Sequence, residues 1–175
     1  MTTFLTTLLV GYTLLVAVLP PWQVNPARVD VLSKQFVQSF YDWYAPKSVD
    51  ATQGPGWAVA LRERRSNFTP ELSRAIAADL AAQSKTSGEI VGLDFDPFLG
   101  SQDPCESYET GRVTQSRRAY SVEVFAICNG KRSERPDVLV VLSRQQNAWV
   151  FTNFSYPGGG DLLSVLKALR NQRRR

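Results

Sequence analysis

The segment from Gly88 to Glu106 is the part of the chain whose residue types could most plainly do chemistry. Its sequence, GEIVGLDFDPFLGSQDPCE, holds five carboxylates, three glycines, two prolines and one of the chain's two cysteines. No lysine or arginine lies between Lys85 and Arg112, although the whole chain carries a formal net charge of +4. Glycine and proline at this density predict a loop of fixed geometry rather than a helix or a long strand.

Four carboxylates of this loop are candidates for binding a ligand or for structuring the loop: Asp94, Asp96, Asp103 and Glu106. Ca²⁺ is bound by several carboxylate and carbonyl oxygens, so Asp94 and Asp96 form a weak calcium alternative. Their spacing does not match an EF-hand loop. We favour the interpretation in which the acids accept hydrogen bonds from loop N–H groups, as Asx-turn residues do. No metal or cofactor is therefore assigned.

Three tyrosines are candidates for lining a pocket near the loop: Tyr44, Tyr120 and Tyr156. A buried aspartate with a raised pKa, such as Asp96, could act as a base beside a tyrosine donor. The chain has no histidine, which excludes Ser–His and Cys–His nucleophile pairs and imidazole metal ligands within it. Nothing in the sequence brings a carboxylate and a tyrosine together, so no catalytic residue is assigned.

The two cysteines allow a geometric test of the fold. If the first hairpin turns about Ser116 and Arg117, paired residues have numbers that sum to 233, and so do Cys105 and Cys128. Unless a bulge shifts the register, the two residues face each other across the ladder or its continuation into the loop. The sequence therefore predicts a Cys105–Cys128 disulfide, which is typical of an oxidising compartment.

The two ends of the chain have distinct compositions. An apolar run from Phe4 to Leu19, followed by two prolines, suits the apolar core of a signal peptide. Because no basic residue precedes it and no clear cleavage site follows, a membrane anchor at residues 4–19 and a buried cytoplasmic helix are alternatives. The basic tail at residues 171–175 is interpreted as a solvated helix end rather than a nucleic-acid contact. We expect a signal peptide or anchor at residues 1–21 and one domain over residues 22–170.

Hydrophobic periodicity divides that domain into helices first and strands later. Apolar residues at helical spacing predict four helices. An alternation of residues with period two predicts four antiparallel strands joined by hairpins. The last helix begins after an N-cap at Asp161. The predicted helices cover residues 26–44, 57–65, 70–83 and 162–170, and the predicted strands cover residues 108–114, 120–127, 138–143 and 148–154. This order predicts an α+β fold with helices packed on a curved four-stranded meander.

The acidic segment also resembles the signature of a bacterial family of exported domains of unknown function. The shared residues are GEIVGLDFDPFLGSQDPC, and further similarities follow in matching order: FYDWY at residues 40–44, TPEL at residues 69–72, WVFTNF at residues 149–154 and DLL at residues 161–163. The resemblance implies the cystatin-like fold shared with the nuclear transport factor 2-like superfamily, and an exported location. It implies no catalytic residues.

Three functions are compatible with these observations. The expected one is a non-catalytic module of the cell envelope, exported to the periplasm or the extracellular space, that binds a small ligand or a protein. One alternative is an inhibitor or immunity protein against an envelope hydrolase, with the acidic loop facing a basic target. The other is a carboxylate–tyrosine isomerase- or dehydratase-like enzyme. Nucleic acid is not an expected partner, and membrane contact is expected only through an uncleaved N-terminal segment.

Overall fold

The computed structural model describes residues 26–85, 92–117 and 119–174. The expected signal peptide or anchor at residues 1–21 lies outside this part. The described helices are α1 (Pro26–Ser48), α2 (Gly56–Glu63), α3 (Pro70–Gln83) and α4 (Leu162–Gln172), with short 3₁₀ turns at Ala51–Gln53 and Arg65–Asn67. The strands are β1 (Ser107–Ser116), β2 (Ala119–Cys128), β3 (Lys131–Arg132), β4 (Val138–Gln145) and β5 (Ala148–Ser155).

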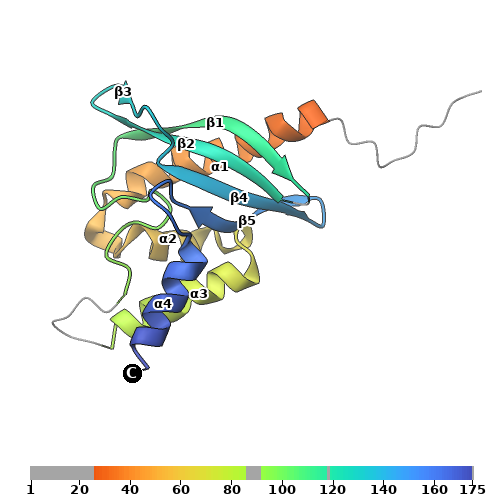
Figure 1. Ribbon diagram of the computed structural model, residues 1–175. Coiled ribbons are helices and arrows are strands. Elements are labelled where there is room, and N and C mark those ends of the chain that lie inside the picture. Colours follow the sequence, from red (N-terminus) through yellow and green to blue (C-terminus); the bar gives the residue numbers. More distant parts are fainter. Residues whose placement is uncertain (1–25, 86–91, 118, 175) are drawn as a thin grey trace, which may run out of the picture.

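The fold is α+β, as predicted: an antiparallel sheet with helices packed against it (Figure 1). The strand order is β1-β2-β4-β5, and β3 pairs with β2 outside this path. Helix α1 contacts β1 and β2, whereas α3 and α4 contact β5 and each other. The sheet therefore has one more strand than the four that the sequence predicted.

The additional strand follows from the Asn129–Gly130 dipeptide, within the segment expected to be a simple connection. Both residues have positive φ, 53° and 71°, which is the geometry of a type I′ hairpin turn. The turn directs Lys131 and Arg132 back along Cys128 and Ile127. The pairing is only two residues long, too short to produce a visible alternation in the sequence.

Helix α1 is longer than predicted. The sequence placed its end before Pro46, but the helix continues through this proline to Ser48. A proline removes one backbone hydrogen bond and clashes with the preceding turn, which is tolerated here within the last turn of the helix. The Ser48 hydroxyl then donates to the Ala45 carbonyl at 2.7 Å and supports that turn.

Aromatic side chains fill the space between α1 and the sheet. Phe40 is their centre: its ring lies 4.7 Å from that of Phe151, 5.3 Å from that of Tyr44 and 5.7 Å from that of Phe98. All four residues are buried, and the small-to-medium side chains of β2 and β4 complete the core. Aromatic rings of this size dominate the burial of apolar surface, so the concave face of the sheet is packed with the protein's own side chains.

The hairpin β1–β2 differs from the predicted register. Its turn lies between Ser116 and Ala119, and a bulge between Thr110 and Val113 shifts the pairing by one residue. Beyond the bulge Ser107 pairs with Ile127, so paired numbers sum to 234 rather than the predicted 233. A β-bulge places an extra residue in one strand and thereby changes the register. On the turn side of the bulge Ser116 pairs with Ala119, a sum of 235, so the hairpin turns one residue later than predicted. The bulge lowers the sum to 234 and leaves the prediction wrong by one residue at the open end of the hairpin.

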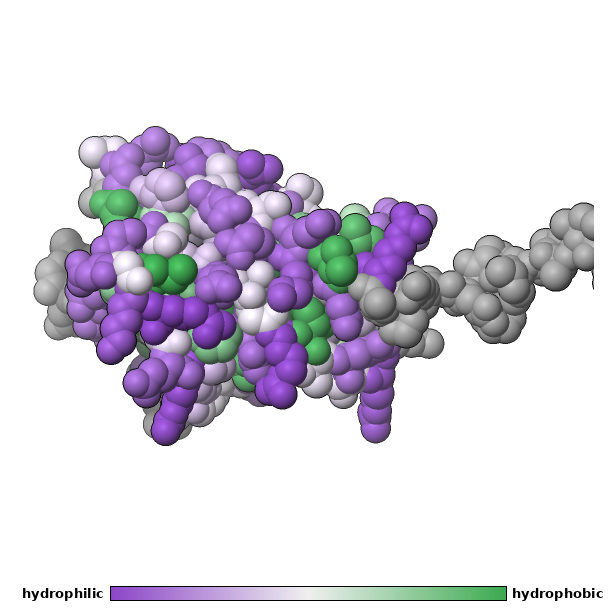
Figure 2. Space-filling view, turned by 90° about the horizontal axis from the view of Figure 1, so that it is seen from above, coloured by the Kyte–Doolittle hydropathy of each residue, from purple (hydrophilic) through white to green (hydrophobic). Residues whose placement is uncertain are grey.

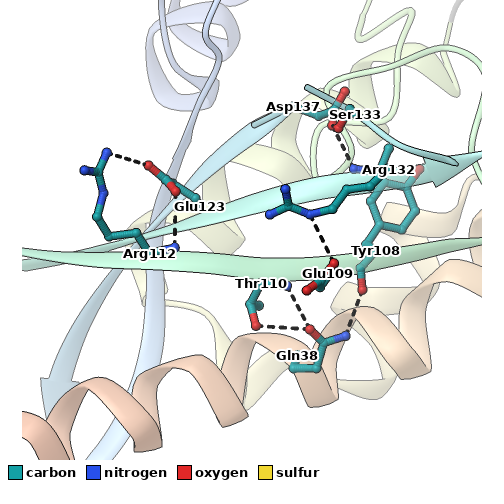
Figure 3. Close-up of polar contacts among 10 residues, drawn as sticks. Gln38, Tyr108, Glu109, Thr110, Arg112, Glu123, Arg132, Ser133 and Asp137 are labelled. Carbon is teal, nitrogen blue, oxygen red and sulfur yellow. Dashed lines mark hydrogen bonds and ion pairs between the residues drawn. The ribbon is translucent and has the colours of Figure 1, made fainter. Parts of the chain in front are cut away.

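A glutamine side chain from α1 covers the free edge of β1. Gln38 Nε2 donates to the Tyr108 carbonyl at 2.8 Å, and Gln38 Oε1 accepts from the Thr110 backbone N–H at 2.9 Å (Figure 3). The amide thus occupies the hydrogen-bonding positions that a neighbouring strand would use. Exposed strand edges favour pairing with other chains, so Gln38 both positions α1 and blocks that edge.

No helix in the described part of the chain is both long and apolar enough to cross a membrane.

Candidate functional site

Three tyrosine hydroxyls hold the centre of the acidic loop. Tyr44 donates to Asp96 Oδ2 at 2.6 Å, Tyr41 donates to the Phe98 carbonyl at 2.6 Å, and Tyr156 donates to the Pro97 carbonyl at 2.9 Å. Tyr41 and Tyr44 lie on α1, and Tyr156 follows β5. The loop is therefore fixed to two distant parts of the chain over three consecutive residues.

The Asp96 carboxylate is buried at the centre of this arrangement, with 5% of its residue surface exposed. Oδ2 accepts from Tyr44, and Oδ1 accepts from the backbone N–H groups of Phe98 and Leu99 at 2.9 and 3.3 Å. Burial raises the pKa of Asp96 to about 6, although the hydrogen bonds from Tyr44 and from the two backbone groups oppose the rise. Both oxygens are thus engaged in holding the turn, as expected for an Asx-type residue.

The Tyr44 hydroxyl is enclosed on its other side by the start of α2. A Cβ atom added to Gly56 would lie 2.8 Å from Tyr44 Oη and 3.0 Å from Ser48 Cα. Only glycine allows this close approach. Tyr44 is fully buried, and burial and the neighbouring Asp96 raise its pKa well above its ordinary value. The phenol therefore stays neutral and donates permanently to Asp96.

The structure unites only part of the predicted site. Asp96, Tyr44 and Tyr156 meet at the loop, whereas Tyr120 lies in β2 with its ring 5.0 Å from that of Trp149. Asp94, Asp103 and Glu106 are exposed, so they do not share the buried site of Asp96. Among the described residues, no three acidic or cysteine side chains come together in a group that could hold a metal ion.

The disulfide predicted from the sequence is present between Cys105 and Cys128, with their Cα atoms 4.9 Å apart. Beside it, both Glu106 carboxylate oxygens accept from the Asn129 backbone N–H at 2.9 Å. The end of the acidic loop is thus joined to the end of β2 both covalently and by a hydrogen bond. A disulfide of this kind indicates a location outside the reducing cytoplasm.

Two hollows flank the clamped loop. One, of about 600 Å³, lies beside the disulfide and is lined by residues that include Asp103, Tyr108 and Arg132. The other, of about 420 Å³, lies beside α2 and includes Trp57, Asp94 and Asp96 in its wall. Near the first hollow Arg132 pairs with Glu109 at 3.1 Å (Figure 3). Its guanidinium also lies 3.5 Å from the centre of the Phe125 ring. The Arg132 guanidinium beside this hollow is thus already partnered.

A further hollow, larger than these two, lies between α3 and α4, and sequence reasoning missed it. This groove has a volume of about 900 Å³ and combines apolar side chains from both helices with basic ones. A signal was present in the sequence, because residues three or four apart share a face of a helix. Ala75, Ala78 and Ala82 recur on one face of α3, and Lys167 and Arg170 recur on one face of α4. Arg174 follows in the turn after α4. Of these basic residues, only the C-terminal ones from Arg170 onward were interpreted, as a solvated helix end.

One residue of the basic tail has a structural partner. Arg173 Nη1 pairs with Asp79 Oδ1 at 2.6 Å, and Asp79 is 1% exposed. Asp79 Oδ2 also accepts from the Leu93 backbone N–H at 3.0 Å. The interpretation of residues 171–175 as merely solvated was therefore wrong for Arg173, because the pair joins the C-terminal ends of α3 and α4.

Comparisons with known proteins give little further identification. Neither protein-family models nor curated proteins match this chain. The chain is similar to a crystal structure of a protein of unknown function from Bacteroides thetaiotaomicron VPI-5482, with 17% sequence identity and a TM-score of 0.49. The similarity covers 74% of this chain and 92% of that chain.

Proposed function

We propose that this protein is an exported, non-catalytic module of the cell envelope that binds a partner through its outer surface. The observation that carries the proposal is that the interior of the molecule is filled, whereas a hollow is present on its outside. Its interior is filled by aromatic side chains around Phe40, whereas a hollow of about 900 Å³ lies outside, between α3 and α4. A protein that holds a substrate inside its fold needs a concave, largely preformed cavity.

The disulfide supports the proposed compartment. Cysteine pairs of this kind form and persist in the periplasm or outside the cell, and are rare in the cytosol. The Cys105–Cys128 bond stabilises the loop against β2. Export is consistent with this chemistry, as is the apolar run at Phe4 to Leu19.

A cystatin-like fold is the finer assignment that we propose for the α+β domain. One long helix, α1, lies against an antiparallel sheet whose principal strands follow one another in order (Figure 1). The resemblance of the acidic segment points to the same fold. On that fold the concave face usually provides the ligand site, and here that face is occupied by the aromatic core.

An isomerase- or dehydratase-like enzyme has two observations in its favour, the 2.6 Å contact between Tyr44 and Asp96 and the raised pKa of Asp96. A catalytic base must reach a substrate proton. Asp96 instead uses both oxygens to hold its own loop, and Gly56 closes the space beside the Tyr44 hydroxyl. The same contact therefore supports a structural role better than a catalytic one.

Affinity purification of the full chain from its own cell envelope tests the proposed function. The expected result is a partner, protein or small ligand, that is retained from the envelope fraction and is absent when the chain is first unfolded. An empty eluate, or a protein found only in the cytosol with both thiols reduced, would overturn the proposal.

A further inference from the structure

The groove between α3 and α4 has an apolar floor made of small and partly buried side chains. Ala75 and Ala82 are half-buried and Ala78 is exposed on the α3 side, while Leu163 and Leu166 lie on the α4 side. Alanine side chains leave room for another backbone to approach a helix closely. The floor is thus shaped to receive apolar side chains from a third segment lying along both helices.

The rim of the groove is strongly basic. Arg74, Lys167, Arg170 and Arg174 are exposed along it, and Glu71 is the single acidic residue among the described residues that line it. No ion pair joins Lys167, Arg170 or Arg174 to an acid within the part of the chain that the structure describes. Like charges gathered along an apolar strip repel one another, and an anionic partner relieves that repulsion.

The shape of the surface favours a peptide segment over a lipid bilayer. A bilayer receives large apolar side chains that project from a protein. The large exposed hydrophobic residues of the described part, Val31, Leu32 and Val49, are not in this groove. Figure 2 shows the molecule from above, on the side away from α3 and α4 in Figure 1, and there hydrophobic side chains form only small, separate groups. The apolar atoms of the groove lie instead at the bottom of a hollow.

We infer that the α3–α4 groove docks an acidic amphipathic helix of a partner protein, with its apolar side chains on the alanine and leucine floor and its carboxylates against the basic rim. This is the helix-in-groove mode of recognition. The inference rests on the proposed function, because it names the partner chemistry of the binding module.

Binding of a synthetic peptide tests the inference. The probe is a fluorescent helical peptide with leucine at helical spacing and glutamate on both sides of that stripe; its counterpart carries lysine in place of glutamate. Fluorescence anisotropy measures both against the full chain, the groove-filling variant Ala78→Trp and the charge-reversed variant Lys167→Glu/Arg170→Glu. The matched control is Arg65→Glu/Arg135→Glu, which makes the same charge change at two exposed positions outside the groove.

The expected result is saturable binding of the glutamate peptide that weakens with salt and falls about tenfold or more in both groove variants, but not in the control. The lysine peptide should not bind. Equal binding by all variants would overturn the inference, and so would binding of phosphatidylglycerol vesicles that is lost in the groove variants while the peptide fails to bind. If an envelope partner is retained equally by the groove variants, the inference fails and the proposed function stands.

Discussion

The Tyr44 hydroxyl donates to Asp96 Oδ2 at 2.6 Å, and both side chains are buried. This contact joins the C-terminal part of α1 to the acidic loop, 52 residues further along the chain. Replacement of Tyr44 by phenylalanine retains the ring packing against Phe40 and removes one of three donors to a buried carboxylate. We expect Tyr44→Phe to lower the free energy of unfolding by about 2 kcal/mol, as measured by urea denaturation.

Tyr120→Phe is the matched control for this substitution. Tyr120 is half-buried, and its hydroxyl has no hydrogen bond among the described contacts, so its loss should change stability little. Equal effects of the two substitutions would contradict the special role of Tyr44.

The pH dependence of stability should report Asp96 directly. Its pKa is raised by burial to about 6 in the folded state, from a reference value of 3.8. Between these values the folded protein holds a proton that the unfolded chain has released, so the contribution of Asp96 to stability falls as the pH rises from about 4 to about 6. Across this range, the free energy of unfolding measured by urea denaturation should fall by roughly 2–3 kcal/mol more in the wild type than in Asp96→Asn. Parallel curves for the two proteins would refute the raised pKa.

Gly56 should tolerate no larger residue. In Gly56→Ala the new methyl group would meet the Tyr44 hydroxyl and the backbone of Ser48, and a forced shift of this kind costs roughly 1–3 kcal/mol. Thermal unfolding measures the loss. Gly158→Ala serves as the control because a Cβ atom there meets nothing within 4 Å; a comparable loss in this variant would show that the close approach at Gly56 is unimportant.

Reduction of the Cys105–Cys128 disulfide should lower the free energy of unfolding by about 3 kcal/mol, because the bond closes a loop with a sequence separation of 23. Urea denaturation with and without dithiothreitol gives the difference, and the double variant Cys105→Ser/Cys128→Ser should behave like the reduced protein. Mass spectrometry of the exported protein under non-reducing conditions checks that the bond forms; two free thiols would count against it.

Gln38→Ala should expose the edge of β1. The Tyr108 carbonyl and the Thr110 N–H would lose their side-chain partner, and an uncovered edge promotes association between chains. We expect lower thermal stability and oligomers that grow with protein concentration, measured by light scattering after size exclusion. The control Gln35→Ala changes an exposed residue of the same helix. It should leave both the thermal stability and the oligomeric state unchanged. A monomeric Gln38→Ala protein at high concentration would argue against the edge-blocking role.

Local signals in the sequence were sufficient for most of the fold. The start of α3 was predicted correctly because Thr69 is an N-cap whose hydroxyl accepts from the Leu72 N–H, and Asp161 acts similarly for α4. The alternation in β2 placed Val122 and Val124 in the core, where both are buried. These features depend on neighbouring residues, so a single sequence contains them.

The misses depend on contacts between distant residues. The bulge that shifts the β1–β2 register lies near Gly111, whose Cβ would stand 2.5 Å from the Phe125 ring, and only the packed hairpin reveals that crowding. The disulfide was nevertheless predicted correctly. Cys105 lies just outside the paired residues, so a register shift of one residue still leaves it close enough to Cys128 for the bond. The α3–α4 groove was missed since its two helices are far apart in the sequence.

The disulfide gives the β1–β2 hairpin a property that hydrogen bonds alone cannot. Cys105 precedes β1 and Cys128 ends β2, so the two strands and their turn form a closed covalent ring. Denaturant can separate the strands only within that ring, and their ends remain close even in the unfolded chain. In an oxidising compartment, each refolding event therefore begins with the β1–β2 hairpin held near its native pairing, and the remaining strands and helices have a template on which to assemble.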